Sequence, residues 1–115
     1  MIHGSWKTVT IAQTPAVASS EVDLGRPYET LIVVCPALTT SATVSIQGAM
    51  VTGGTFQNIH TTDPATGNNK QVITAAFTSA NFTWIAPIGG VQFITLTLSA
   101  AQAAAKTFYV CGVRS

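Results

Sequence analysis

Charged side chains are scarce in this sequence. Only 8% of its 115 residues are Asp, Glu, Lys or Arg, and two long stretches, residues 30–62 and 71–105, contain none of them. A freely diffusing protein usually carries charge on about 25–35% of its surface positions. Thr, Ser, Ala, Gln and Asn must therefore cover much of the solvent-facing side. Such a surface suits a subunit that is packed against neighbours.

Other absences exclude whole classes of partner. No apolar run approaches the roughly 18 residues that cross a bilayer, and no basic segment followed by an apolar run opens the chain, so we expect neither a membrane partner nor a secretion signal. The net charge is +1, and the five Lys and Arg residues are scattered along the chain. Phosphate binding needs clustered cations, so we expect no nucleic-acid partner.

Groups for catalysis or metal binding are equally few. The chain has four carboxylates and two histidines, and only His60 lies away from the N-terminus. An enzyme needs converging acids, bases and nucleophiles, and no metal-ligand spacing such as Cys-x-x-Cys is present. We therefore expect no enzyme, no catalytic residue, no metal site and no cofactor. Glu21, Asp23 and Glu29 are interpreted as a charged sheet edge, with a shared cation as the alternative.

The two cysteines, Cys35 and Cys111, each lie in an apolar, strand-like run. A free thiol in such a run behaves as a small hydrophobic side chain. We interpret both as buried, reduced thiols, and a disulfide remains the alternative if the two strands are neighbours.

Strand patterns dominate the rest of the chain, because β-branched and aromatic residues recur in short runs between turn residues. We predict an all-β protein of one domain, residues 1–115: a two-sheet antiparallel β-sandwich, jelly-roll-like, with about eight or nine short strands. An immunoglobulin-like strand order is the competing topology. A turn is predicted at residues 25–27, a break at 87–90, and a loop or single helical turn at 99–105. The predicted strands are residues 8–12, 21–24, 28–35, 42–47, 55–60, 71–77, 81–86, 91–98 and 106–113.

The alternation within these strands also predicts the core, because successive side chains of a strand point to opposite faces. The predicted core residues are Val9, Ile11, Leu31, Val33, Val44, Ile46, Phe56, Phe82, Trp84, Ile94, Leu96, Phe108 and Val110.

Two turn regions are candidate contact surfaces. Residues 61–70, TTDPATGNNK, form a polar loop that is long for a sandwich, and residues 48–54 expose apolar side chains unless a partner covers them. A solvated loop and a turn folded back on its own sheet are the alternatives. The candidate interface residues are Met50, Val51, Asp63, Pro64, Gly67, Asn68, Asn69 and Lys70.

Four segments together resemble a family of small structural proteins of tailed bacteriophages: DLGRPYETLIVVCPAL (23–38), SATVSIQGAMVTGGTFQNI (41–59), FTWIAPIGGVQFITL (82–96) and SAAQAAAKTFYVCGVRS (99–115). The resemblance implies a β-sandwich component of a bacteriophage virion, assembled in the host cytoplasm, and no particular position on the particle. Together with the missing catalytic groups and the charge-poor surface, it leads us to expect a non-enzymatic capsid decoration or cement protein. Its implied partners are other virion proteins, above all the major capsid protein, and copies of itself.

Two alternatives stay open at this point. One is a neck or tail structural protein. The other is a carbohydrate-binding module displayed on a virion, which requires Trp6, Tyr28 or Trp84 to be exposed on a concave face. Similar sugar-binding sandwiches often carry an Asp-Gly pair in the turn that here reads GAMVTGG, residues 48–54. This uncharged turn favours a protein contact.

Overall fold

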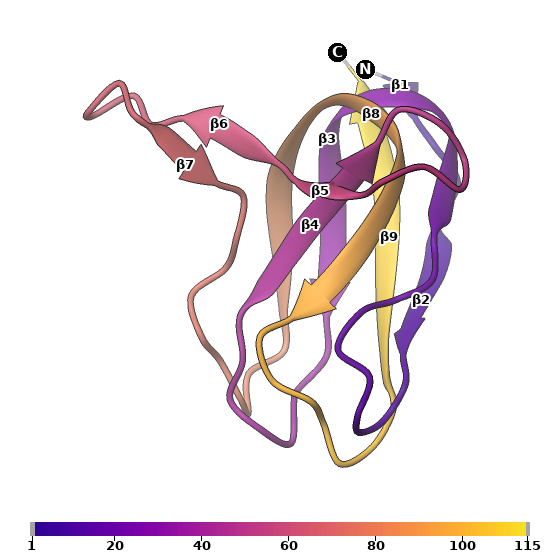
Figure 1. Cartoon of the computed structure of the whole chain (residues 1–115), viewed down its shortest axis with the longest axis vertical. Coiled ribbons are helices and arrows are strands. Elements are labelled where there is room, and N and C mark those ends of the chain that lie inside the picture. Colours follow the sequence, from indigo (N-terminus) through magenta and orange to yellow (C-terminus); the bar gives the residue numbers. More distant parts are fainter. Residues whose placement is uncertain (1, 115) are drawn as a thin grey trace.

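Nine β-strands form the regular structure of residues 2–114, the part of the chain that this computed structural model describes, and none of these residues is helical (Figure 1). None of them therefore forms a helix that could cross a membrane. The all-β prediction and its number of strands are confirmed. The strands are β1 (Ile2–His3), β2 (Lys7–Ile11), β3 (Val22–Cys35), β4 (Val44–Ala49), β5 (Gln57–Asn58), β6 (His60–Thr62), β7 (Asn69–Gln71), β8 (Phe82–Leu98) and β9 (Lys106–Arg114).

Seven strands form one antiparallel sheet that folds over itself into two layers (Figure 1). The order is β1-β9-β3-β8-β4-β5, with β2 also paired to β9. The long strands β3 and β8 run through both layers: Val33 pairs with Trp84 in the first layer, and Val22 pairs with Ile94 in the second. The first layer adds β9 and β2, and the second adds β4 and β5. In other β-sandwiches too, a bent strand can pass from one layer to the other and so form a corner of the fold.

The predicted breaks at residues 25–27 and 87–90 are wrong, because both lie inside continuous strands. Gly25, Gly89 and Gly90 have positive φ angles of 89°, 66° and 98°, a conformation that glycine adopts without steric cost. The register between β3 and β8 shifts on both sides of Tyr28. The turn residues therefore bend two paired strands together at one end of the sandwich.

The core prediction is largely confirmed. Ten of its thirteen residues are buried, and Phe82 and Trp84 pack against the core while half-buried. The prediction for Phe56 is wrong, because this side chain is half-buried and lies outside the core cluster. Tyr28 fills the space beside Gly112, where any side chain would overlap its ring. The core residues that the alternation pattern missed include Leu24, Tyr28, Leu38, Val72, Ile88 and Leu98.

The side of the first layer that points away from the core is named here the outer face. Its members alternate with buried residues along β2, β3, β8 and β9, and they pair with one another across the strands, as Ile32 does with Ile85. The outer face consists of Thr8, Thr10, Thr30, Ile32, Val34, Thr83, Ile85, Pro87, Thr107 and Tyr109. Cys111 and Val113 lie on the same side of β9 but are buried, so they are not counted in the outer face.

The loop predicted at residues 61–70 is confirmed only at its centre, residues 63–68, because the ends of the range belong to two strands. His60 pairs with Gln71 and Thr62 with Asn69, so β6 and β7 form a hairpin that projects from the sandwich (Figure 1). The predicted strand at residues 71–77 is also wrong beyond Gln71, because only isolated bridges, such as that from Ser45 to Ile73, join it to β4. The residues that flank the hairpin must leave and rejoin the sheet edge, which breaks the ladder there.

The segment 99–105 is a loop, and Gln102 anchors it. This side chain is 1% exposed. Its Oε1 accepts hydrogen bonds from the backbone N–H groups of Thr39 and Thr40 at 2.9 and 2.8 Å. Its Nε2 donates to the carbonyl oxygens of Thr40 and Ala100, both at 3.0 Å. One amide thus joins two loops at the end of the sandwich opposite the bends (Figure 1).

Candidate functional site

The turn after β4 presents two apolar side chains to solvent. Met50 is 96% exposed and Val51 is 59% exposed. Both were predicted as interface residues, and the structure places them on one turn. Contiguous exposed apolar side chains are typical of contact surfaces, whereas single ones are common on any protein. A pair at the tip of a turn is therefore a candidate for binding.

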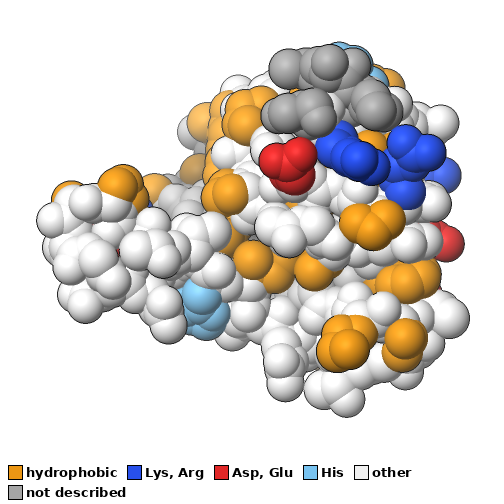
Figure 2. Space-filling model, turned by 90° about the horizontal axis from the view of Figure 1, so that it is seen from above, with side chains coloured by type: hydrophobic (Ala, Val, Ile, Leu, Met, Phe, Trp, Pro, Cys, Tyr) orange, Lys and Arg blue, Asp and Glu red, His pale blue; other side chains and the backbone are white. Residues whose placement is uncertain are grey.

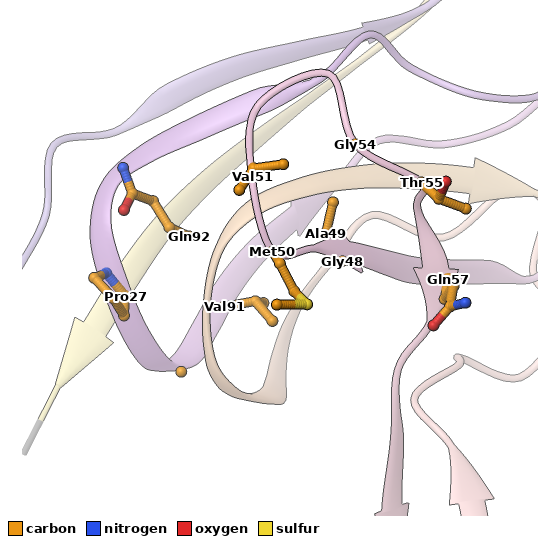
Figure 3. A pocket seen from close by; sticks show the side chains of 11 residues that line it. Pro27, Gly48, Ala49, Met50, Val51, Gly54, Thr55, Gln57, Val91 and Gln92 are labelled. Carbon is orange, nitrogen blue, oxygen red and sulfur yellow. The ribbon is translucent and has the colours of Figure 1, made fainter.

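The same turn forms one wall of a groove of about 720 Å³. Pro27 of β3 and Val91 of β8 contribute the opposite wall, next to Gly90 in the bend (Figure 3). The bend of the long strands and the turn after β4 therefore meet at this end of the molecule. We name this cavity the end groove.

A carboxylate holds the turn in place. Glu21 accepts a hydrogen bond from the Thr52 hydroxyl at 2.5 Å and another from the Gly53 backbone N–H at 2.7 Å. Gly53 has a φ of 69°, and the Gly54 N–H donates to the Val51 carbonyl at 3.1 Å. Hydrogen bonds to an ionised group are stronger than those between neutral groups. The exposed turn is thus pre-organised from a residue about thirty positions earlier in the chain.

Asp23 stabilises the neighbouring bend. Its Oδ1 accepts hydrogen bonds from the Gln92 side-chain amide at 2.9 Å and the Gly25 N–H at 2.8 Å. These two bonds, helped by the charge of Lys7, lower the pKa of the Asp23 carboxyl against a small opposing effect of burial. Two of the three carboxylates interpreted from sequence as one charged edge, Glu21 and Asp23, thus stabilise two different turns.

The other six predicted interface residues belong to the β6–β7 hairpin, away from the end groove (Figure 1). Asp63 shapes the hairpin tip: its Oδ1 accepts from the Ala65 N–H at 2.9 Å, and its carbonyl accepts from the Gly67 N–H at 2.7 Å. Pro64, Gly67, Asn68, Asn69 and Lys70 are exposed. The structure therefore separates the predicted interface into two surfaces.

A crevice of about 230 Å³ lies where the hairpin meets the sandwich. Trp84 and Pro87 of β8 form one wall, and Asp63, Lys70 and Gln71 of the hairpin contribute polar groups to the other. Of the three aromatic residues considered for sugar binding, Trp84 is half-buried in this crevice, Tyr28 is buried in the core, and Trp6 is 55% exposed.

Charged side chains are few on the face of the molecule at the bends. In the view of Figure 2 most of the Lys, Arg, Asp and Glu side chains in sight lie in the upper right part, and uncharged side chains cover most of this face. Within residues 2–114, no three His, Cys, Asp or Glu side chains come together as a metal-holding group. His60 approaches a backbone carbonyl, that of Asn58, at 3.4 Å.

Both cysteines are free and buried, as the sequence predicts. Burial raises the pKa of the Cys35 thiol to about 11. The Cys111 thiol donates to the Gly4 carbonyl at 3.3 Å. Both thiols therefore belong to the packing of the sandwich.

Comparison with known proteins gives similarity in fold. No family model and no curated protein matches the chain. The crystal structure of the SPBc2 prophage-derived protein YomS aligns with a TM-score of 0.55 and 13% identity, covering 97% of this chain and 95% of that one. The cyanophage Pam1 capsid asymmetric unit aligns over 96% of this chain and 84% of that one, with 13% identity and a TM-score of 0.35, too low to indicate a common fold. The chain thus shares its fold with a prophage-derived protein.

Proposed function

We propose that this chain is a non-enzymatic structural subunit of a bacteriophage particle, and that it decorates the capsid exterior. Two independent features support the assignment to a phage. Four segments of the sequence resemble small structural proteins of tailed phages, and the fold is similar to that of a prophage-derived protein. The scarcity of charge, 8% of residues, fits a subunit that is covered by neighbours.

The observation that carries the docking part of the proposal is the exposure of Met50. A methionine that is 96% exposed beside a groove lined by Val51 and Val91 offers apolar area that binding would remove from water. The Glu21 hydrogen bonds hold this turn in one conformation before binding, which reduces the entropy lost on association. Repeated docking sites on a shell multiply a modest contact through avidity.

The test is the position and occupancy of the chain on purified particles. Quantitative mass spectrometry should find a copy number that matches a capsid lattice, whereas a handful of copies would assign the chain to the neck or tail. The double substitution Met50→Ser and Val51→Ser should leave the isolated protein folded and lower its occupancy. Val17→Ser is the matched control, because Val17 is 36% exposed and lies outside the end groove. Unchanged occupancy of the double variant would assign docking to another surface.

Glycan binding is a second candidate function, favoured by the crevice at Trp84. A tryptophan ring beside a carboxylate, an ammonium and an amide offers both stacking and hydrogen bonding to a sugar. The crevice is smaller than the roughly 300–1,000 Å³ of drug-sized sites, which limits it to a short saccharide. Trp6 and Trp84 are the two tryptophans, so a Trp6→Phe background makes Trp84 the single fluorescent reporter. Methyl pyranosides that leave its emission unchanged up to high concentration would exclude this function.

A further inference from the structure

The outer face of the first layer has no role in the docking just proposed. Its residues lie on β2, β3, β8 and β9, and none of them lines the end groove. Ile85 is 60% exposed and Tyr109 is 47% exposed. They are joined across the strands by Ile32 and Val34, since Ile32 pairs with Ile85 and Val34 pairs with Tyr109. These four side chains therefore form a connected, solvent-accessible apolar stripe across the adjacent strands β8, β3 and β9.

Charge is absent from this surface. All ten members of the outer face are uncharged, and five of them are threonines. Natural β-proteins place charged side chains, above all Lys, where an exposed sheet would otherwise associate with another copy, most often at its edges. Asp23, Arg26 and the other charged residues of β3 precede the part of that strand that contributes to this layer. On β2 and β9 the charged residues Lys7, Lys106 and Arg114 lie at the strand ends, outside the outer face. The absence of charge is thus a property of the outer face and not of the whole layer.

The lack of charge restricts what can cover the outer face. An ordinary protein surface carries charge on about a quarter or more of its positions, and those charges would lose water here without finding a partner. A fitting partner must itself present a flat, uncharged surface. The outer face of a second copy of this chain is such a surface. A two-fold contact brings the same patch of both subunits together, so a charged residue near the axis would face the identical charge of the other subunit.

We propose that the outer face is a contact between two copies of this chain, packed sheet against sheet. The expectation that the chain contacts copies of itself was drawn from its resemblance to virion proteins, and the structure adds the surface. Four strands spaced about 4.8 Å apart, with five residues rising about 3.3 Å each, give a footprint of roughly 300 Å². Two such footprints fall short of the roughly 1,200 Å² of stable complexes. The contact is therefore weak in dilute solution and is reinforced by fixed neighbours on a particle.

Sedimentation equilibrium of the whole chain, from about 10 μM to about 1 mM, tests the proposal in the concentration range of weak association. The wild-type protein should form a larger species at the high end. Ile85→Lys should weaken this association at least about tenfold, because like charges then face each other across the contact. Val17→Lys is the matched control, since it adds the same charge at an exposed valine outside the outer face. Circular dichroism confirms that each variant is folded.

A mixing experiment separates charge repulsion from damage to the fold. Ile85→Lys and Ile85→Glu should each be monomeric alone, and an equal mixture should recover the larger species, because the added charges then attract. A wild-type protein that stays monomeric at about 1 mM, an Ile85→Lys variant that associates like wild type, or equal losses in Val17→Lys would each overturn the proposal. The measurement needs no particle, so its failure is distinguishable from failure of the proposed decoration role.

Discussion

Truncation of Gln102 should destabilise the protein far more than its place in an alanine-rich loop indicates. The Gln102→Ala substitution removes an amide that accepts from two backbone N–H groups and from the Thr39 hydroxyl, at 2.8–3.1 Å. It also removes the donor for the carbonyl oxygens of Thr40 and Ala100. Two loops that lie about sixty residues apart in sequence then lose most of the hydrogen bonds between them, although the Ala103 N–H still donates to the Thr39 hydroxyl at 3.1 Å.

The magnitude follows from the groups that are left without partners. A buried donor or acceptor that loses its partner costs about 1–3 kcal/mol. Thr39 and Thr40 are themselves exposed, so water replaces some of the lost bonds once the loop relaxes. We expect a loss of roughly 2–4 kcal/mol in the free energy of unfolding, which corresponds to a fall of roughly 10 °C or more in Tm for a domain of this size.

Urea unfolding followed by circular dichroism measures this loss directly. Gln13→Ala is the matched control, because Gln13 is exposed, and a surface substitution of this kind changes stability by less than about 0.5 kcal/mol. If Gln102→Ala behaves like Gln13→Ala, the buried amide does not anchor the loops, and the reasoning is refuted.

Three further predictions concern titratable groups. Glu21→Ala should accelerate hydrogen exchange at the Gly53 amide and lower stability by about 1–2 kcal/mol, since a charge-assisted pair of bonds is lost; unchanged exchange would contradict the pre-organised turn. Burial raises the pKa of the Cys35 thiol to about 11 from 9.0. Between these two pH values the unfolded chain loses the thiol proton and the folded chain keeps it, so the free energy of unfolding should fall as pH rises from 9 to 11. Urea unfolding at pH 9 and at pH 11 measures this fall, which should be smaller in Cys35→Ala. The hydrogen bonds from Gln92 and Gly25 lower the pKa of the Asp23 carboxyl from 3.8. The contribution of Asp23 to the free energy of unfolding is therefore present above that pH and is lost at lower pH. Asp23→Asn should therefore reduce the loss of stability on acidification below pH 4, and an unaltered acid profile would count against these bonds.

The candidate site shows how far the sequence reaches. Met50 and Val51 could be predicted because apolar residues between turn glycines have no core to join. The role of Glu21 could not, since its partners Thr52 and Gly53 lie thirty residues away and nothing local marks them. A carboxylate near a strand end looks the same in sequence whether it faces solvent or fixes a distant turn.

The sequence by itself determined the strand content, most of the core and the scarcity of surface charge. These follow from local alternation, because a period of two decides which side of a strand is buried without reference to distant residues. Only the tertiary structure decided that the glycines at 25 and 89–90 bend β3 and β8 instead of ending them. A turn residue ends a strand when the chain beyond it pairs elsewhere and bends the strand when both halves keep the same neighbour. That choice depends on hydrogen bonds between segments some sixty residues apart, which local sequence does not record.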